Sequence, residues 1–109
     1  MIPFYKICTK QTIHEAEKKG FLVHPSLQAE GFIHAAYLHQ LPQVIAKHYS
    51  HQTDLLLSKI NPDELTSPWK SEDLKQKGEA FPHVYGPINW DAIVEVVPIE
   101  QLELRLKQF

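Results

Sequence analysis

The sequence has little of what marks a secreted or membrane protein. Cys8 is its single cysteine, so no intrachain disulfide can form and disulfide-stabilised extracellular folds are excluded. No segment approaches the roughly 20 consecutive apolar residues that a transmembrane helix requires. The first residues, Met1 to Lys6, lack the cationic stretch and long apolar run of a signal peptide. We therefore expect a cytoplasmic protein without a membrane partner.

Basic charge and metal-binding motifs are also scarce. The chain has 11 lysines and arginines against 13 acidic residues, a formal net charge of -2. Nucleic-acid binders usually carry a clustered basic face, so we expect no nucleic-acid partner. The zinc, metalloprotease, dinucleotide-fold and P-loop motifs are absent. We expect no metal centre, although a metal held by His34, His83 and a carboxylate is the alternative left open.

Length and composition indicate one ordinary domain. Of the 109 residues, 43% are hydrophobic and 22% are charged, values close to those of an average globular domain. A chain of this size buries roughly two-thirds of its unfolded surface, enough for one core. No repeat, low-complexity tract or linker interrupts it, so residues 1–109 are expected to form a single domain.

Hydrophobic periodicity predicts strands and helices in alternation. A strand is expected over 4–8, followed by a helix that begins at Thr9 or Thr12 and ends at Lys19 before Gly20. A short strand ending at His34 should lead into a helix with Pro42 in its first turn. The apolar run 54–60 is typical of a buried central strand, and the β-branched run 92–97 predicts a last strand.

Other segments predict loops. Residues 21–30 and 66–80 have no clear period, so both are expected to be connecting loops, the second of them mobile. Residues 81–87 contain two prolines, which exclude a plain central strand and favour a sheet edge or a shaped loop. The tail from Gln101 to Gln108 fits either a strand or a helix.

Two of the seven histidines stand out as candidate functional residues. His34 ends an apolar run where a strand should leave its sheet, a common place for a binding crevice. His83 lies among prolines and a glycine, whose restricted backbone would hold side chains around a ligand. The alternatives are a hydrogen-bonded structural histidine and a packed turn. His14, His39, His48 and His51 are read as solvated surface imidazoles.

Two aromatic residues are further candidates. Tyr85 offers a ring face and one hydroxyl, which suit stacking on a flat ligand, although a tyrosine that caps the core fits equally well. Trp69 lies in the polar loop and is a more suggestive ligand platform than Trp90, although most tryptophans are packing residues.

Two motifs, EGFIHAA (Glu30 to Ala36) and FPHVYGPI (Phe81 to Ile88), resemble a small, mostly bacterial family known as domain of unknown function 952. The similarity spans nearly the whole chain and includes YKIC near its start and the strand DLLLSKI. It implies an α+β fold similar to the ADP-ribosyltransferase superfamily. In that fold two small, mostly antiparallel sheets with two or three short helices clasp a cleft, which holds NAD in the active relatives.

The resemblance also implies roles for individual residues. In the active relatives a histidine on an early strand binds a ribose hydroxyl, an aromatic residue stacks on nicotinamide, and a glutamate stabilises the oxocarbenium-like centre. His34 resembles the first, and Tyr85 or His83 would be its partner across the cleft. The implied catalytic residues are His34 and His83, and the implied ligand-binding residues are Gly31, Tyr85, Trp69 and Glu30.

The transferase glutamate has no close match here. The candidates for it are Glu30, Glu72, Glu79 and Glu95. The chain also departs from its family, which usually has serine or threonine where Ala36 stands and glutamate where Lys70 follows the tryptophan. The first change loses a helix cap, and the second replaces an acceptor with a cation unless Glu72 substitutes.

Three functions follow from these observations. The favoured one is a module that binds a nucleotide or NAD-like small molecule, whose identity and oligomeric context the sequence leaves open. The second is an ADP-ribosyl or glycosyl-type transferase or hydrolase acting on NAD or a nucleoside, with a loop carboxylate for electrostatic stabilisation. The third is a protein-interaction domain that uses the loop 66–80 as its contact surface.

Overall fold

The computed structural model describes residues 2–107 of the chain. Its helices and strands follow each other in this order: β1 (Phe4–Thr9), α1 (Lys10–Lys19), β2 (Phe21–Leu22), α2 (Pro25–Glu30), β3 (Ile33–His34), α3 (Leu41–His48), β4 (Leu55–Ile60), β5 (Trp69–Glu72), β6 (Phe81–Val84), β7 (Ile88–Asn89), β8 (Ile93–Pro98) and α4 (Leu102–Leu106). Single 3₁₀ turns lie at Leu38–Gln40, Pro62–Glu64, Trp90–Ala92 and Ile99–Gln101. None of the helices in this part of the chain is both long enough and apolar enough to cross a bilayer.

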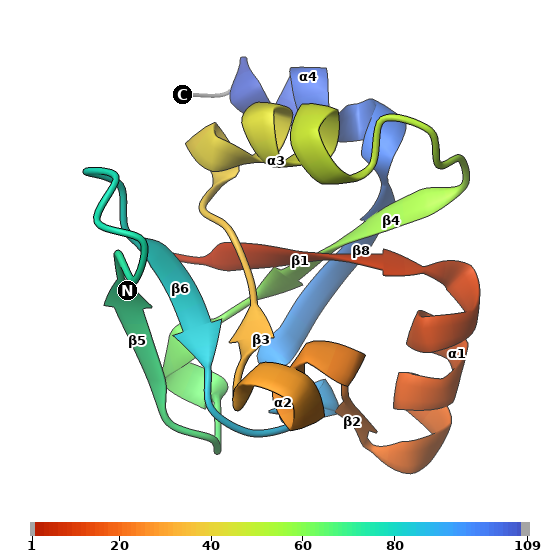
Figure 1. The fold of residues 1–109 in the computed structure, drawn as a ribbon. Coiled ribbons are helices and arrows are strands. Elements are labelled where there is room, and N and C mark those ends of the chain that lie inside the picture. The colour runs from red at the N-terminus through yellow and green to blue at the C-terminus, as the bar shows by residue number, and fades with distance from the viewer. Residues whose placement is uncertain (1, 108–109) are drawn as a thin grey trace.

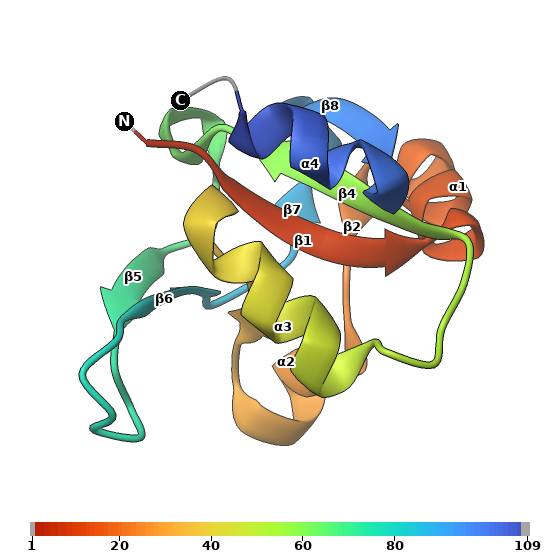
Figure 2. The ribbon, with the colours of Figure 1, turned by 90° about the horizontal axis from the view of Figure 1, so that it is seen from above.

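Three antiparallel sheets form the framework. One has the strand order β1-β4-β8, another has the order β3-β6-β5, and β2 pairs with β7. Both ribbon views place β5 and β6 at one end of the molecule and α1 at the opposite end (Figures 1 and 2). The expected α+β class with antiparallel sheets is therefore confirmed. The third, two-stranded sheet was not expected.

The predicted central strand is confirmed. β4 pairs with β1 on one side and β8 on the other, and Leu57 in its middle is completely buried. Side chains of successive strand residues point to opposite faces, so β1 contributes to two cores. Phe4 and Cys8 pack in one core, and Tyr5 and Ile7 pack with Leu57 in the other.

A short backbone bridge joins β1 to the chain that follows β3. The Tyr5 N–H donates to the Ala36 carbonyl at 2.7 Å, and the Ala36 N–H donates to the Tyr5 carbonyl at 2.9 Å. The bridge uses backbone atoms alone, so it needs no particular side chain at Ala36. Gln40 caps the following turn, because its side-chain oxygen accepts a hydrogen bond from the Tyr37 N–H at 2.9 Å.

The first helix begins and ends as predicted. Thr9 caps α1, because its hydroxyl accepts a hydrogen bond from the Thr12 N–H at 3.1 Å. Gly20 follows the helix with a φ of 89°, and its N–H donates to the Ala16 carbonyl. Few residues other than glycine adopt this left-handed conformation, which explains the stop.

The prediction of a loop over 21–30 was wrong. The segment contains β2 and the helix α2, which starts at Pro25. Its cap is His24, whose Nδ1 accepts a hydrogen bond from the Ser26 N–H at 3.1 Å. Histidine is not among the residues preferred as helix caps, so the usual start signal was missing from the sequence.

The loop expected over 66–80 and the sheet edge expected at 81–87 are also corrected. The first contains β5, and β6 occupies the centre of its sheet despite Pro82. The Pro82 carbonyl accepts a hydrogen bond from the Ala35 N–H at 3.0 Å. In an antiparallel strand the nitrogen and the carbonyl of one residue point to the same side, so the Pro82 nitrogen, which has no hydrogen, also points toward Ala35, just beyond the end of β3. The sheet therefore loses a single bond at the end of a ladder. In the tail, Leu102–Leu106 is a helix, and Gln108 lies outside the described residues.

Replacing the central leucine should destabilise the fold strongly. Leu57→Ala removes a fully buried side chain, and we expect it to lower the free energy of unfolding by about 2–5 kcal/mol. Leu104→Ala is the matched control, since Leu104 is 63% exposed and should change stability by about 0.5 kcal/mol or less. Urea unfolding followed by circular dichroism measures both. Equal losses in the two variants would contradict the assignment of β4 as the core strand.

His24 should make stability depend on pH. Burial, followed by the charges of Lys6 and His34, lowers its pKa from 6.5 to about 4. Between these two values the unfolded chain binds a proton that the folded chain does not, so the free energy of unfolding falls as the pH falls. His24→Asn keeps a good cap and should remove this part of the pH dependence.

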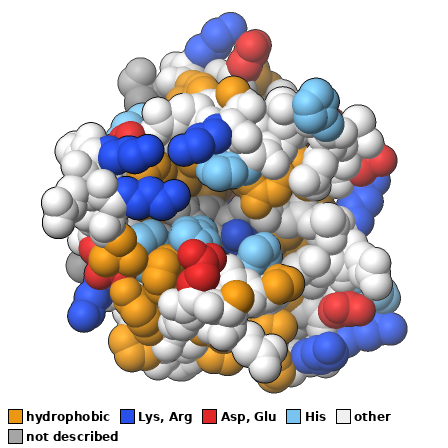
Figure 3. Space-filling view, viewed as in Figure 1, with side chains coloured by type: hydrophobic (Ala, Val, Ile, Leu, Met, Phe, Trp, Pro, Cys, Tyr) orange, Lys and Arg blue, Asp and Glu red, His pale blue; other side chains and the backbone are white. Residues whose placement is uncertain are grey.

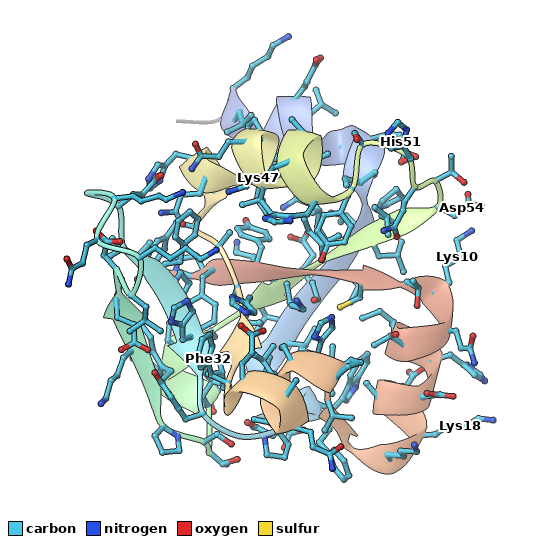
Figure 4. The ribbon with its side chains drawn as sticks, viewed as in Figure 1. Lys10, Lys18, Phe32, Lys47, His51 and Asp54 are labelled. Carbon is cyan, nitrogen blue, oxygen red and sulfur yellow. The ribbon has the colours of Figure 1, made fainter. Side chains whose placement is uncertain are left out.

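Urea unfolding at pH 7, 5.5 and 4 tests this expectation. His51→Asn is the control, because His51 is exposed and lies far from Phe32 at the edge of the molecule (Figure 4). If the free energy of unfolding depended on pH equally in His24→Asn and in the wild type, His24 would be readily protonated in the folded state.

Candidate functional site

One face of the sheet β3-β6-β5 collects polar side chains. Register places His34 opposite His83, and His83 opposite Lys70, so the three residues project from the same face. The alternate positions face the core, where Ile33 and Val84 are completely buried. The strands thus present two histidines next to each other although 49 residues of sequence separate them.

Glu30 holds the first histidine. Gly31 ends α2 in the left-handed conformation, with a φ of 89°, and the chain turns back so that His34 lies beside the helix end. The two side chains meet with 2.9 Å between His34 Nε2 and Glu30 Oε2. The carboxylate accepts, so Nε2 carries the hydrogen and Nδ1 can itself accept a hydrogen bond. His34 also lowers the pKa of the Glu30 carboxyl, chiefly through this hydrogen bond.

Glu72 holds the second histidine together with a tyrosine. His83 Nδ1 lies 3.0 Å from Glu72 Oε1, and the Tyr85 hydroxyl donates to the same oxygen. The hydrogen bond from Tyr85, followed by that from His83, lowers the pKa of Glu72. The same bond raises the pKa of the Tyr85 hydroxyl, because the phenol would have to lose the proton that it donates. Glu72 is therefore an ionised acceptor shared by two donors.

Phe32 lies at the centre of these side chains. Its ring stacks on His83 with 4.2 Å between centroids and 28° between planes. It meets His34 edge-on at 4.8 Å and Tyr85 at 5.4 Å. Figure 4 labels Phe32 between β6 and α2. We call the group Glu30, Phe32, His34, Glu72, His83 and Tyr85 the two-histidine cluster.

The two histidines differ in exposure. The side chain of His34 is 46% exposed, and that of Glu30 is 52% exposed. The side chain of His83 is 8% exposed, beneath Phe32. The ring centroids lie 5.4 Å apart at 81°. His34 is thus available to a ligand from outside, while His83 supports the cluster from below.

Four of the candidate residues named from the sequence come together in this cluster: Glu30, His34, His83 and Tyr85. Gly31 shapes the turn between Glu30 and His34. Trp69 does not join them, because it lies on the opposite face of its sheet and its ring packs against Phe4 at 5.2 Å. Its role in ligand binding has no support from this placement.

The structure also sorts the glutamates. Glu30 and Glu72 belong to the cluster, whereas Glu79 bonds to Gln40 and Gln43, and Glu95 forms an ion pair with Arg105. Lys70 places its ammonium 5.7 Å from the centre of the Tyr85 ring.

Sequence reasoning missed the role of Phe32. It lies inside the EGFIHAA motif, midway between Glu30 and His34, and this position was the available signal. Among residues 2–107, no group of three or more histidine, cysteine, aspartate and glutamate side chains is arranged to hold a metal ion.

Comparison with known proteins identifies the family. The profile of a family described as "Protein of unknown function (DUF952)" matches residues 7–96. The chain belongs to the DUF952 family. Both EGFIHAA and FPHVYGPI lie inside the matched region, and so does Glu72. All residues of the two-histidine cluster therefore belong to the part of the chain that matches the family.

Solved structures with a similar fold are known. The crystal structure of protein CC0527 from Caulobacter crescentus is similar, with a TM-score of 0.79 and 26% identity over 88% of this chain and 84% of that one. The solution NMR structure of CC0527 is similar with a TM-score of 0.69 and 25% identity over 90% of this chain and 84% of that one. A search of curated proteins finds no match.

The Tyr85 hydroxyl should control the acidity of Glu72. Tyr85→Phe removes the hydrogen bond that contributes most to the lowered pKa of Glu72, so that pKa should rise toward the ordinary glutamate value. Carboxyl NMR chemical shifts recorded during an acid titration measure it. Tyr49→Phe is the control, since Tyr49 lies outside the cluster, and the Glu72 titration should not change. An unaltered Glu72 titration in Tyr85→Phe would contradict the arrangement described here.

Proposed function

We propose that the two-histidine cluster binds a nucleotide or NAD-like small molecule, with His34 and Glu30 contacting its ribose. The observation that carries this proposal is the half-exposed His34–Glu30 pair. His34 Nδ1 can accept a hydrogen bond from one hydroxyl, and the second oxygen of Glu30 can accept from a neighbouring hydroxyl. Two acceptors side by side suit the adjacent hydroxyls of a ribose.

The aromatic residues and Lys70 suit the rest of such a ligand. Tyr85 and Phe32 form an apolar surface beside His34, on which a flat heterocyclic ring can pack. The Lys70 ammonium near Tyr85 supplies a positive charge to a ligand that carries phosphate. In this proposal the fold is of the ADP-ribosyltransferase type and the cluster lies in its cleft.

A second candidate function, glycosyl transfer from NAD or a nucleoside, is favoured by the position of Glu72. In that reaction the bond between ribose C1′ and the base breaks, and the base leaves with the bonding electron pair. A nucleophile such as water then bonds to C1′ and loses a proton. Glu72 is an ionised carboxylate in the cluster and would stabilise the positive charge that develops on the sugar.

Ligand-induced stabilisation should reveal binding. A ligand at about 100 times its dissociation constant should raise the free energy of unfolding by roughly 2.7 kcal/mol. We expect a saturable rise in the unfolding temperature with NAD, ADP-ribose, nicotinamide or adenosine, and we expect His34→Ala to abolish it. His14→Ala is the control, because His14 is exposed on α1, away from the cluster.

The outcomes separate the candidate functions. Stabilisation lost in His34→Ala without consumption of the ligand supports the binding module. Release of nicotinamide from NAD, lost in Glu72→Gln while binding persists, supports glycosyl transfer. A protein that none of these compounds stabilises contradicts both functions and favours the protein-interaction domain.

A further inference from the structure

The side chain of Lys6 is largely buried, and its ammonium has no partner among residues 2–107. It lies on β1 between Phe4 and Cys8, on the strand face that packs into the core, and it is 5% exposed. Within residues 2–107 its ammonium forms no hydrogen bond or ion pair. Burial lowers the pKa of Lys6, since the charged form loses its hydration. An apolar residue would fit this position at lower cost, so the amine requires an explanation.

Lys6 lines a cavity whose lining lacks acidic residues. The cavity has a volume of about 270 Å³ and runs along the edge of β1. Its lining residues include lysine, histidine, threonine, tyrosine and glutamine, but no aspartate or glutamate. Figure 3 shows a hollow over β1, between α2 and α3, with a basic side chain recessed within it, histidine side chains around it and an acidic side chain at its rim. The lining itself thus holds a positive charge and no carboxylate.

Several residues that line this space have hydrogen atoms to donate. His24 Nδ1 accepts from the Ser26 N–H, so the ring hydrogen is on Nε2 and is free to be donated. The Thr12 hydroxyl accepts from Thr9, which leaves its own hydrogen for another acceptor. The Tyr5 N–H bonds to Ala36 on the open edge of β1, and the Ile7 N–H points to the same edge because alternate residues share a direction.

The helix α1 adds to this field. It is ten residues long, and its N-cap Thr9 and the first-turn residue Thr12 line the cavity. The N-terminus of a helix carries a partial positive charge and unpaired N–H groups, which favour an anion. The buried Lys6 ammonium and the helix N-terminus therefore favour the same kind of ligand.

We propose that this cavity binds the phosphate or pyrophosphate group of a small-molecule ligand, with Lys6, Thr12 and His24 as its contacts. At about 270 Å³ the cavity is smaller than most sites for whole small molecules, which fits the anionic end of a ligand. His24 lines the cavity and caps α2, the helix whose last residue, Glu30, bonds to His34, so α2 connects the cavity to the two-histidine cluster. The idea that one ligand spans the cavity and the two-histidine cluster rests on the proposed function. The anion site itself is independent of that function.

Inorganic pyrophosphate tests the site directly. Isothermal titration calorimetry should show saturable binding of pyrophosphate to the wild type. Lys6→Met keeps the length of the side chain and removes its charge, so it should weaken binding roughly tenfold or more. Lys59→Met is the matched control, because Lys59 lies on the neighbouring strand outside the cavity and its loss should leave binding unchanged.

A second variant and a second probe keep the test decisive. Thr12→Val retains the shape of a partly exposed residue and should weaken pyrophosphate binding several-fold even if Lys6→Met fails to fold, which circular dichroism would show.

Adenosine, which has a ribose but no phosphate, reports on the two-histidine cluster alone. Adenosine binding without pyrophosphate binding overturns the anion site and leaves the proposed function standing. Pyrophosphate binding that depends on Lys6 and Thr12, without adenosine binding, supports the anion site and overturns the proposed function. Pyrophosphate binding of wild-type strength in both variants overturns the anion site.

Discussion

The backbone bridge between Tyr5 and Ala36 sets the relative position of everything that could bind a ligand. Its two hydrogen bonds attach the edge of β1 to the chain just beyond β3, and so join the sheet β1-β4-β8 to the sheet β3-β6-β5. Lys6 follows Tyr5 directly, and His34 precedes Ala36 by two residues. The cavity and the two-histidine cluster are therefore neighbours as a consequence of this bridge, which needs no particular side chain at position 36.

Burial and carboxylate pairing then give each group its character. His83 can be buried because Glu72 accepts its Nδ1 hydrogen and Phe32 covers its ring, so a polar ring lies under an aromatic one without an unmet bond. Within the described residues no buried side-chain nitrogen or oxygen lacks a partner. The Lys6 ammonium keeps slight access to the cavity instead of a partner. A structural role explains His83, but it does not explain Lys6.

The parts of this fold that could be predicted are those in which local chemistry and burial agree. The apolar run of β4, the Thr9 cap and the Gly20 stop each carry their own signal, and each was predicted correctly. α2 was missed because its cap is a histidine. β6 was taken for an edge because Pro82 lacks an N–H, and the structure accommodates this by placing the proline where its neighbour β3 has ended. The assignment of Glu72 to the cluster depended on the pairing of β5 with β6, which no local pattern shows.

Charged groups are distributed differently in the two-histidine cluster and in the adjoining cavity, and this difference bears on what the protein binds. The two-histidine cluster contains two carboxylates, each already accepting from a histidine, while the adjoining cavity contains none. Acceptors beside His34 suit hydroxyl groups, and the donors around Lys6 suit an anion. Lys70 beside Tyr85 moves the balance of the cluster further toward a ligand with negative charge. A molecule with a hydroxyl-bearing ring at one end and phosphate at the other satisfies both regions, whereas an uncharged metabolite would leave the Lys6 ammonium as costly as it is in the free protein.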